Sequence, residues 1–151
     1  MGYTHYWENV PSGFLPKEAI KHIETLLAHY APLIQIEFDD PQNPIATDEL
    51  IHFNGKGENG HETFFFTPEP SFQFCKTARK PYDIVVCEVL LILKHFIPEM
   101  KLSSDGFDHS LMPEYQTGEH EGTWPEAIAN VSKRLHTDLN VTKEWCESRS
   151  S

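Results

Sequence analysis

The chain has 151 residues, of which 39% are hydrophobic and 23% are charged, and its formal net charge is −11. This size and composition are typical of one folded domain. The negative charge argues against a broad basic surface for duplex DNA or RNA, which needs many phosphate contacts, and against binding to an anionic membrane. We therefore expect neither a nucleic-acid polymer nor a membrane among its partners.

The cysteines and the N-terminal residues indicate in which cellular compartment the protein is expected. The three cysteines form no Cys-x-x-Cys pair, so we expect neither a disulfide framework nor a cysteine zinc site, and we predict no metal and no cofactor. The N-terminal residues lack the basic and apolar segments of a signal peptide. The longest apolar run, residues 84–93, is too short to span a bilayer. The expected location is the cytoplasm.

The first half of the chain is expected to combine several strands with one helix. Apolar residues at helical spacing, bounded by prolines, predict a helix from Pro16 to Tyr30. Strands are predicted at residues 3–7, 33–38, 50–53 and 63–66, and a loop at 39–47. The dipeptide Asn59-Gly60 predicts a hairpin turn between the last two of these strands.

The second half centres on one strongly apolar helix. Residues 81–96 are apolar nearly all round, which predicts a central, buried helix that begins at Pro81. Short strands are expected on either side of it, at residues 72–74 and 100–103. A long acidic loop at 107–122 precedes a capping box, Thr123-x-x-Glu126, which opens a third helix.

This order of elements predicts an α+β fold. We expect a single-layer, mostly antiparallel or mixed sheet packed by about three helices, one of them central and buried. Residues 1–136 are expected to form one domain that includes the acidic loop. Residues 137–151 are polar and are predicted to form a flexible tail.

A basic loop comes directly before the apolar helix. Lys76, Arg79 and Lys80 lie within five positions of an otherwise acidic chain, with Thr77 between them. A helix N-terminus presents unpaired N–H groups and the positive end of the helix dipole, and both favour an anion. The loop 74–83 is therefore predicted to bind a small anionic ligand.

A second interpretation of the same loop needs no ligand. Asp83 lies in the first turn of the predicted helix and can itself supply the negative charge. Together with Glu62 and Asp105 it can pair with the three cations as an internal ion network. Both interpretations agree that the cations require an acidic partner.

Other residues complete the predicted site. Tyr3, Trp7 or Tyr82 could stack a flat base, and the turn at Ser104 and Asp105 could meet the ligand edge-on. The candidate ligand-binding residues are therefore Lys76, Thr77, Arg79, Lys80, Tyr82, Asp83, Tyr3, Trp7, Ser104 and Asp105. Three residues could serve as acid–base groups, namely His5, His61 and Glu62. No complete catalytic set is present.

Several of these motifs together resemble a known family. Gly-Tyr-Thr-His-Tyr-Trp at 2–7, Gly-His-Glu-Thr-Phe at 60–64, residues 74–83 and Ser-Ser-Asp-Gly at 103–106 resemble a family of short uncharacterised proteins from bacteria and phages. The resemblance covers about residues 2–135 and carries no established activity. It implies that the polar motifs belong together. Small phage proteins of this size sometimes sequester nucleotide immune signals, which is an analogy of size and origin.

The function predicted from the sequence is binding of a small phosphate-bearing ligand, such as a nucleotide or a nucleotide-derived signal in an anti-defence role. One alternative is an enzyme that hydrolyses or modifies a nucleotide-like substrate. Another is an acidic protein–protein interaction module. The incomplete catalytic set favours binding over catalysis, and a homo-oligomer is compatible with the sequence.

Overall fold

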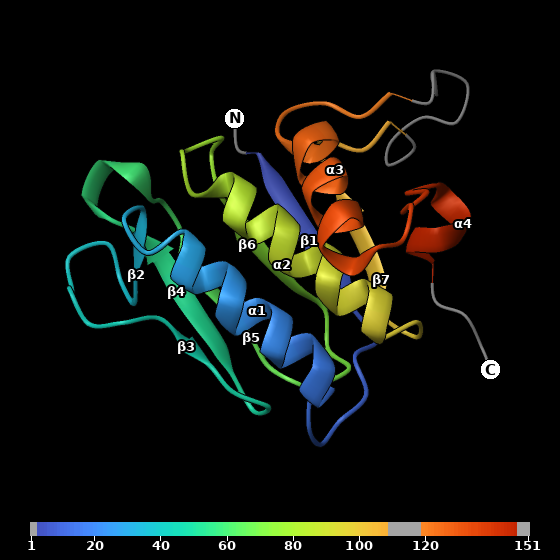
Figure 1. The fold of residues 1–151 in the computed structure, drawn as a ribbon, viewed down its shortest axis with the longest axis horizontal. Coiled ribbons are helices and arrows are strands. Elements are labelled where there is room, and N and C mark those ends of the chain that lie inside the picture. Colours follow the sequence, from blue (N-terminus) through green and yellow to red (C-terminus); the bar gives the residue numbers. More distant parts are fainter. Residues whose placement is uncertain (1–2, 109–118, 148–151) are drawn as a thin grey trace.

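The computed structural model describes residues 3–108 and 119–147. Its strands lie side by side behind three helices, so the predicted α+β class is confirmed (Figure 1). In chain order the elements are β1 (Thr4–Glu8), α1 (Lys17–His29), β2 (Ile34–Gln35), β3 (Ile45–Ala46), β4 (Ile51–Gly55), η1 (Gly57–Asn59), β5 (Phe64–Phe66), β6 (Gln73–Lys76), α2 (Asp83–Phe96), β7 (Lys101–Ser104), α3 (Trp124–Leu135) and α4 (Lys143–Cys146).

The described strands form two antiparallel sheets in place of the single sheet predicted. The first sheet has the order β6-β1-β7, and its register sets His5 opposite both Cys75 and Ser104. In the second sheet β4 pairs with β2, β3 and β5. The N–H of Glu62, just before β5, donates to the carbonyl of Lys76 in β6, which joins the two sheets at their adjoining edges.

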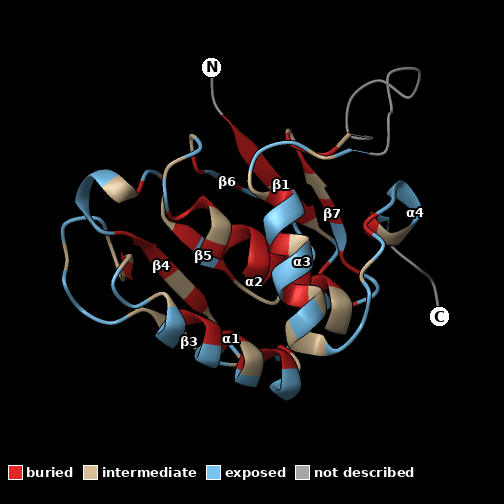
Figure 2. Cartoon of the chain, turned by 45° about the horizontal axis from the view of Figure 1, so that its top comes forward, coloured by how far each residue is buried: buried red, intermediate tan, exposed pale blue. Residues whose placement is uncertain are grey.

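Helix α2 forms the centre of the core, as its sequence predicts. It lies between α1 and α3 on one face of the strand layer (Figure 1). Nearly all its side chains are buried, whereas α1 and α3 expose their outer faces (Figure 2). Each fully buried large apolar side chain stabilises the fold by about 1.5–3 kcal/mol. Within the described residues, no helix is long and apolar enough to cross a membrane.

The bounds of several strands and turns differ from the sequence prediction, because strand pairing depends on residues that are distant in the chain. The strand expected at 33–38 is reduced to β2, and the loop expected at 39–47 contains β3. The predicted hairpin is present as the β4–β5 pair, but η1 widens its turn. Thr123 precedes α3 as predicted, yet its side chain makes no cap hydrogen bond, and its hydroxyl donates to Asp83.

The segment expected to be a flexible tail packs against the domain as far as Glu147. Val141 and Cys146 are buried, and Thr142 caps the short helix α4 by accepting from the N–H of Trp145. The buried ammonium of Lys94 in α2 donates to the carbonyl of Glu147. Side-chain burial and this cross-chain bond are non-local, so the polar composition of the segment did not reveal them. Of the predicted acidic loop, residues 109–118 lie outside the described residues.

Candidate functional site

The structure brings four of the predicted site residues into one buried network. The network consists of His5 from β1, Thr77 after β6, Asp83 at the start of α2 and Ser104 at the end of β7, together with Thr123 before α3. His5, Thr77 and Ser104 are completely buried, and Asp83 is 1% exposed. The motifs that carry these residues therefore meet in space, at the end of the first sheet beside the start of α2.

Hydrogen bonds fix the proton on His5. The Ser104 hydroxyl oxygen accepts from the indole N–H of Trp124 at 2.8 Å and from the N–H of Gly106 at 3.0 Å. Both of its lone pairs are then occupied, so its own proton is donated to His5 Nδ1 at 2.7 Å. His5 consequently carries its proton on Nε2 and donates it to Asp83 Oδ1 at 2.6 Å.

This Ser–His–Asp chain has the same order of hydrogen bonds as a catalytic triad, but a substrate cannot reach its serine or histidine. A nucleophilic serine needs a free lone pair and room for a substrate, whereas Ser104 and His5 are both 0% exposed. The described residues leave no path for a substrate to either side chain. The network therefore stabilises the fold, and the acid–base role suggested for His5 has no support in this geometry.

Asp83 supplies the negative charge at the start of α2. Its carboxylate accepts from His5, Thr77 and Thr123. Burial by itself raises the pKa of Asp83, but the bonds from His5, Thr123 and Thr77 together hold that pKa below its ordinary value. The positive end of the helix is thus matched by an internal carboxylate, as the ligand-free interpretation supposed. The predicted ion network is not seen, because among the described residues Asp83, Glu62 and Asp105 form no ion pair with Lys76, Arg79 or Lys80.

Asp83, His5 and Cys87 are the described residues whose donor atoms lie close enough to share a metal ion. The Cys87 sulfur lies 3.6 Å from His5 Nε2 and 3.6 Å from Asp83 Oδ2. Burial raises the pKa of the Cys87 thiol well above its ordinary value, and the Asp83 charge raises it further. A metal would have to displace that thiol proton and the existing hydrogen bonds, so the trio fits a hydrogen-bonded core better than a metal centre.

Among the described residues, the cations of the predicted loop form no ion pair with the network. Arg79 is 55% exposed, its guanidinium lies 4.0 Å from the centroid of the Tyr3 ring, and it pairs with Glu121 at 3.7 Å. Ala78 and Arg79 both have left-handed backbone, at φ 51° and 57°, which turns the chain sharply between β6 and α2. Lys80 is half-buried and bonds through its backbone to Thr77 and Asp83.

Glu62 and Tyr82 hold the edge of β6. The Glu62 carboxylate accepts from the N–H of Lys76 at 3.0 Å, and the Tyr82 hydroxyl donates to the Glu62 carbonyl. His61 is exposed, and its backbone bonds to the Asn54 side chain. Glu62 and Tyr82 therefore stabilise the edge of β6, and these contacts are separate from the buried network.

Two of the predicted stacking residues are inside the core. Trp7 is 1% exposed and packs against Phe64 and Phe66, and Tyr82 is completely buried. Tyr3 is 4% exposed, and Arg79 lies over its ring. None of the three offers a free ring face, because alternation along β1 turns Tyr3 and Trp7 toward the helices.

The opposite face of the same sheet carries the exposed rings. Phe72 and Phe74 are 58% and 47% exposed, and the Tyr6 ring stacks on Phe72 with centroids 5.9 Å apart and planes at 27°. Lys76 holds its ammonium 5.8 Å from the Phe74 ring centroid. On a solvent-facing sheet surface this is a row of aromatic side chains that no helix covers.

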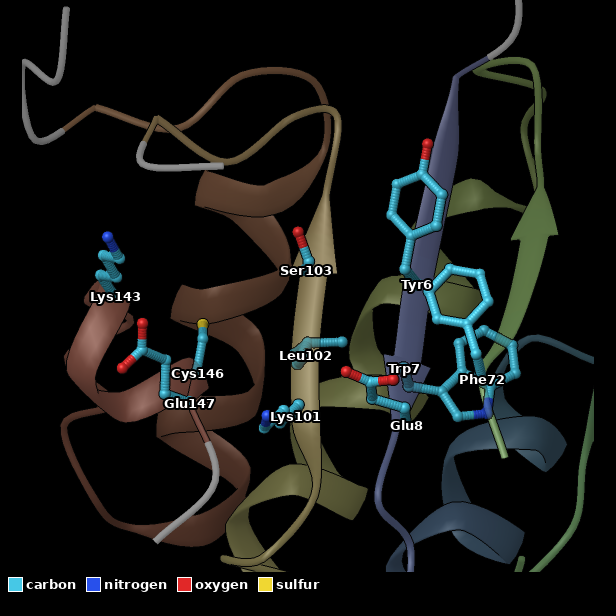
Figure 3. Close-up of a pocket in the computed structure, with 10 residues that line it drawn as sticks. All are labelled: Tyr6, Trp7, Glu8, Phe72, Lys101, Leu102, Ser103, Lys143, Cys146 and Glu147. Atoms are coloured by element: carbon cyan, nitrogen blue, oxygen red, sulfur yellow. The ribbon is translucent and has the colours of Figure 1, made fainter. Parts of the chain in front are cut away.

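Beside these rings the outer sheet face is hollowed into a cavity of about 230 Å³, which we call the outer groove. Tyr6 and Phe72 border it on one side, and α4 borders it on the other with Lys143 and Glu147 (Figure 3). Strand β7 lies between them and contributes Lys101 and Ser103, and Glu8 lines the groove from β1. Neither Lys101 nor Lys143 forms an ion pair with another described residue.

One contact links the outer groove to the predicted site. The Tyr6 hydroxyl donates to Asp105 Oδ1 at 3.1 Å, and the N–H of Thr4 donates to Asp105 Oδ2 at 3.0 Å. Asp105 therefore orients the Tyr6 ring that borders the groove. This bond also raises the pKa of Tyr6, although burial is the larger cause.

Reasoning from the sequence missed most of the outer groove. Alternation already sets Tyr6 on the face opposite Tyr3, His5 and Trp7, and Phe72 and Phe74 are exposed by the same rule once β6 is assigned. No sequence signal places α4 beside β7, because its residues read as a polar tail. Comparison of the chain with family models, with curated proteins and with solved structures gives no match.

Proposed function

We propose that the protein binds a small phosphate-bearing molecule with a flat ring, a nucleotide or a nucleotide-derived signal, in the outer groove. The observation that carries the proposal is the stacked Tyr6–Phe72 pair at the border of a groove that also holds Lys101 and Lys143, two lysines that pair with no described carboxylate. The ligand class is the one predicted from the sequence. The site is moved from the basic loop to the outer sheet face.

Each part of a nucleotide has a matching group in the groove. Stacking of a base on an aromatic side chain contributes about 1–3 kcal/mol, and the exposed face of Phe72 is available for it. Lys101 and Lys143 can each donate to phosphate, at about 1.5–3 kcal/mol for a hydrogen bond to a charged group. Glu8 and Glu147 can accept from the amino groups of a base. Together these terms suit an affinity in the micromolar range.

The surrounding charge selects a small ligand over a polymer. The whole chain carries a net charge of −11, which repels the long run of phosphates in a nucleic-acid strand. A mononucleotide brings few charges and is small enough to lie against one cavity. The residues suggested as acid–base groups, namely His5, His61 and Glu62, do not line the groove, which favours binding over turnover.

A second candidate function uses the same surface for a protein partner. Large exposed apolar side chains are typical of interaction sites, and Phe65 on β5 is 50% exposed in addition to Phe72 and Phe74. This candidate needs the rings but not the lysines. Charge-neutralising substitutions therefore separate it from nucleotide binding.

Calorimetric titration with AMP, cyclic AMP, NAD and inorganic phosphate tests the proposal. We expect at least one nucleotide to bind, and Phe72→Ala and Lys101→Gln each to weaken its binding about tenfold. Arg79→Gln serves as the matched control, because it removes a cation of the predicted loop but leaves the groove intact. Chromatography of the released ligand should return it unchanged.

The proposal is contradicted if no nucleotide binds, or if Phe72→Ala and Lys101→Gln leave the affinity unchanged. Loss of binding in Arg79→Gln alone would return the site to loop 74–83. Recovery of an altered nucleotide would identify an enzyme in place of a binding protein.

A further inference from the structure

A second cavity lies on the helical side of the molecule, away from the outer groove. It has a volume of about 610 Å³ and is bordered by the C-terminal ends of α1 and α3, with Glu88 of α2 among its lining residues. Helices cover the inner face of the strand layer, so this cavity and the outer groove open on different sides of the fold (Figure 1). A ligand bound in one would not occupy the other.

Glu88 is an acidic residue in the middle of an otherwise apolar helix. It is 3% exposed, and its Oε2 accepts both from the Tyr30 hydroxyl at 2.8 Å and from the Asn130 side-chain amide at 3.0 Å. Its Oε1 receives no hydrogen bond from any described residue. Glu88 lines the cavity, and Oε1 is not among the described polar atoms that are fully buried without a partner. This oxygen is therefore free to accept from a donor on a ligand in the cavity.

Around this carboxylate, the cavity is bordered by basic side chains. Lys133 and Arg134 lie in the last turn of α3, and His29 and His136 lie at the ends of α1 and α3. Cations at helix C-termini are favourable in themselves. However, neither Lys133 nor Arg134 pairs with a carboxylate in the part of the chain that the structure describes. Both remain available to an anion in the cavity.

Burial raises the pKa of Glu88, and the bonds from Asn130 and Tyr30 lower it again in part. The positive charge of Arg134 also lowers this pKa, and Glu126 on α3 raises it. Glu88 and Arg134 also line the same cavity. One small molecule can therefore contact both groups.

We propose that this cavity binds a small molecule that carries a hydrogen-bond donor at one end and a phosphate at the other, in the class of aminoalkyl phosphates. The donor, an amino group, bonds to Glu88 Oε1. The phosphate is held by Arg134 and Lys133 at the border of the cavity. The site rests on the Glu88 carboxylate and the α3 cations, independently of the aromatic surface of the outer groove.

Titration of the ¹⁵N-labelled protein with aminoethyl, aminobutyl and aminohexyl phosphate tests this site, because the three probes span different separations of amine and phosphate. We expect one of them to shift the side-chain amide signals of Asn130. Glu88→Gln keeps acceptors for Tyr30 and Asn130 but removes the charge, and should weaken that probe about tenfold. Binding of inorganic phosphate should not change in this variant.

Arg134→Gln, on the border of the cavity, should weaken both the aminoalkyl phosphate and inorganic phosphate. Lys17→Gln, at an exposed position at the start of α1 that lines neither cavity, is the matched control and should change neither. The site is refuted if no probe shifts Asn130 at millimolar concentration, or if Arg134→Gln leaves the affinity of the bound probe unchanged. The Arg134→Gln result decides the matter if Glu88→Gln does not fold.

Discussion

The two faces of β1 differ in how their polar and aromatic groups are satisfied. On the inner face, His5 lies in a buried network in which Asp83 and Ser104 are hydrogen-bonded on all sides. On the outer face, Tyr6 and Phe72 expose their rings beside lysines that have no ionic partner among the described residues. The members of the buried network thus satisfy one another, whereas the outer rings and lysines are exposed to solvent.

This difference separates a structural role from a binding role within one strand. A saturated, buried polar network fixes how elements pack and is expensive to break. An exposed row of rings and cations adds little to folding, and this is the surface to which we assign the proposed binding role. Substitutions on the inner face should therefore change stability, and those on the outer face should change binding.

The largest expected effect is at Asp83. Asp83→Asn places an amide where two hydroxyls and an imidazole N–H all donate, so we expect a loss of about 3–5 kcal/mol in the free energy of unfolding. Urea denaturation at neutral pH measures it. Because folding lowers the pKa of Asp83, the carboxylate contributes fully above its ordinary pKa of about 3.9. That contribution is lost as the pH falls further, so the gap to wild type should narrow in acid.

Lys94 should show the next largest effect. Its buried ammonium donates to the carbonyls of Pro98 at 2.6 Å, Met100 at 2.5 Å and Glu147 at 3.2 Å, and so joins α2 to β7 and to the segment after α4. Lys94→Met should lower the free energy of unfolding by about 2 kcal/mol. The control Lys143→Met, at an exposed position, should change it by less than about 0.5 kcal/mol. Equal effects would show that α4 is not held in this way.

The same substitution at two tyrosines should have opposite signs. The Tyr3 hydroxyl is buried and has no hydrogen-bond partner among the described residues, whereas the Tyr82 hydroxyl donates to the Glu62 carbonyl. Tyr3→Phe should therefore raise the free energy of unfolding by about 1 kcal/mol, and Tyr82→Phe should lower it by about the same amount. Thermal and urea denaturation of the pair measure this; two losses of equal size would mean that Tyr3 has a partner, such as a bound water.

Arg79 should have the smallest effect on stability. Its ion pair with Glu121 joins two side chains that are 55% and 74% exposed, and exposed pairs contribute little. The contact with the Tyr3 ring adds about 0.5–1 kcal/mol at an exposed site. We expect Arg79→Gln to lower the free energy of unfolding by less than about 1 kcal/mol. A larger loss, measured by urea denaturation, would make Arg79 part of the structural core.

Local patterns in the sequence were sufficient to predict most of the helices and strands. The apolar run of α2, the prolines around α1 and the glycine-rich turn after β4 each act within a few residues, so they predict structure directly. The capping box at Thr123 does not form, and the Thr123 hydroxyl is instead directed at Asp83, forty residues away in the chain. Such competition between a local and a distant partner cannot be read from spacing.

The sequence singled out most residues of the buried network, but it did not predict that they bond to one another in the core. Alternation placed His5 with Tyr3 and Trp7, and the motif at 74–83 included Thr77 and Asp83. Only the register of β1 with β6 and β7 shows that these groups satisfy one another. The outer groove depends further on α4, whose packing rests on non-local contacts of Cys146 and Lys94.

Chemical-shift mapping with AMP on the ¹⁵N-labelled protein tests the contrast between the two faces most directly. We predict that the largest shifts fall on Tyr6, Phe72, Lys101 and Ser103 around the outer groove, while the amides of His5, Thr77 and Asp83 stay unchanged. Shifts concentrated at Thr77, Arg79 and Asp83, with the outer groove silent, would contradict the account and place the ligand at the start of α2.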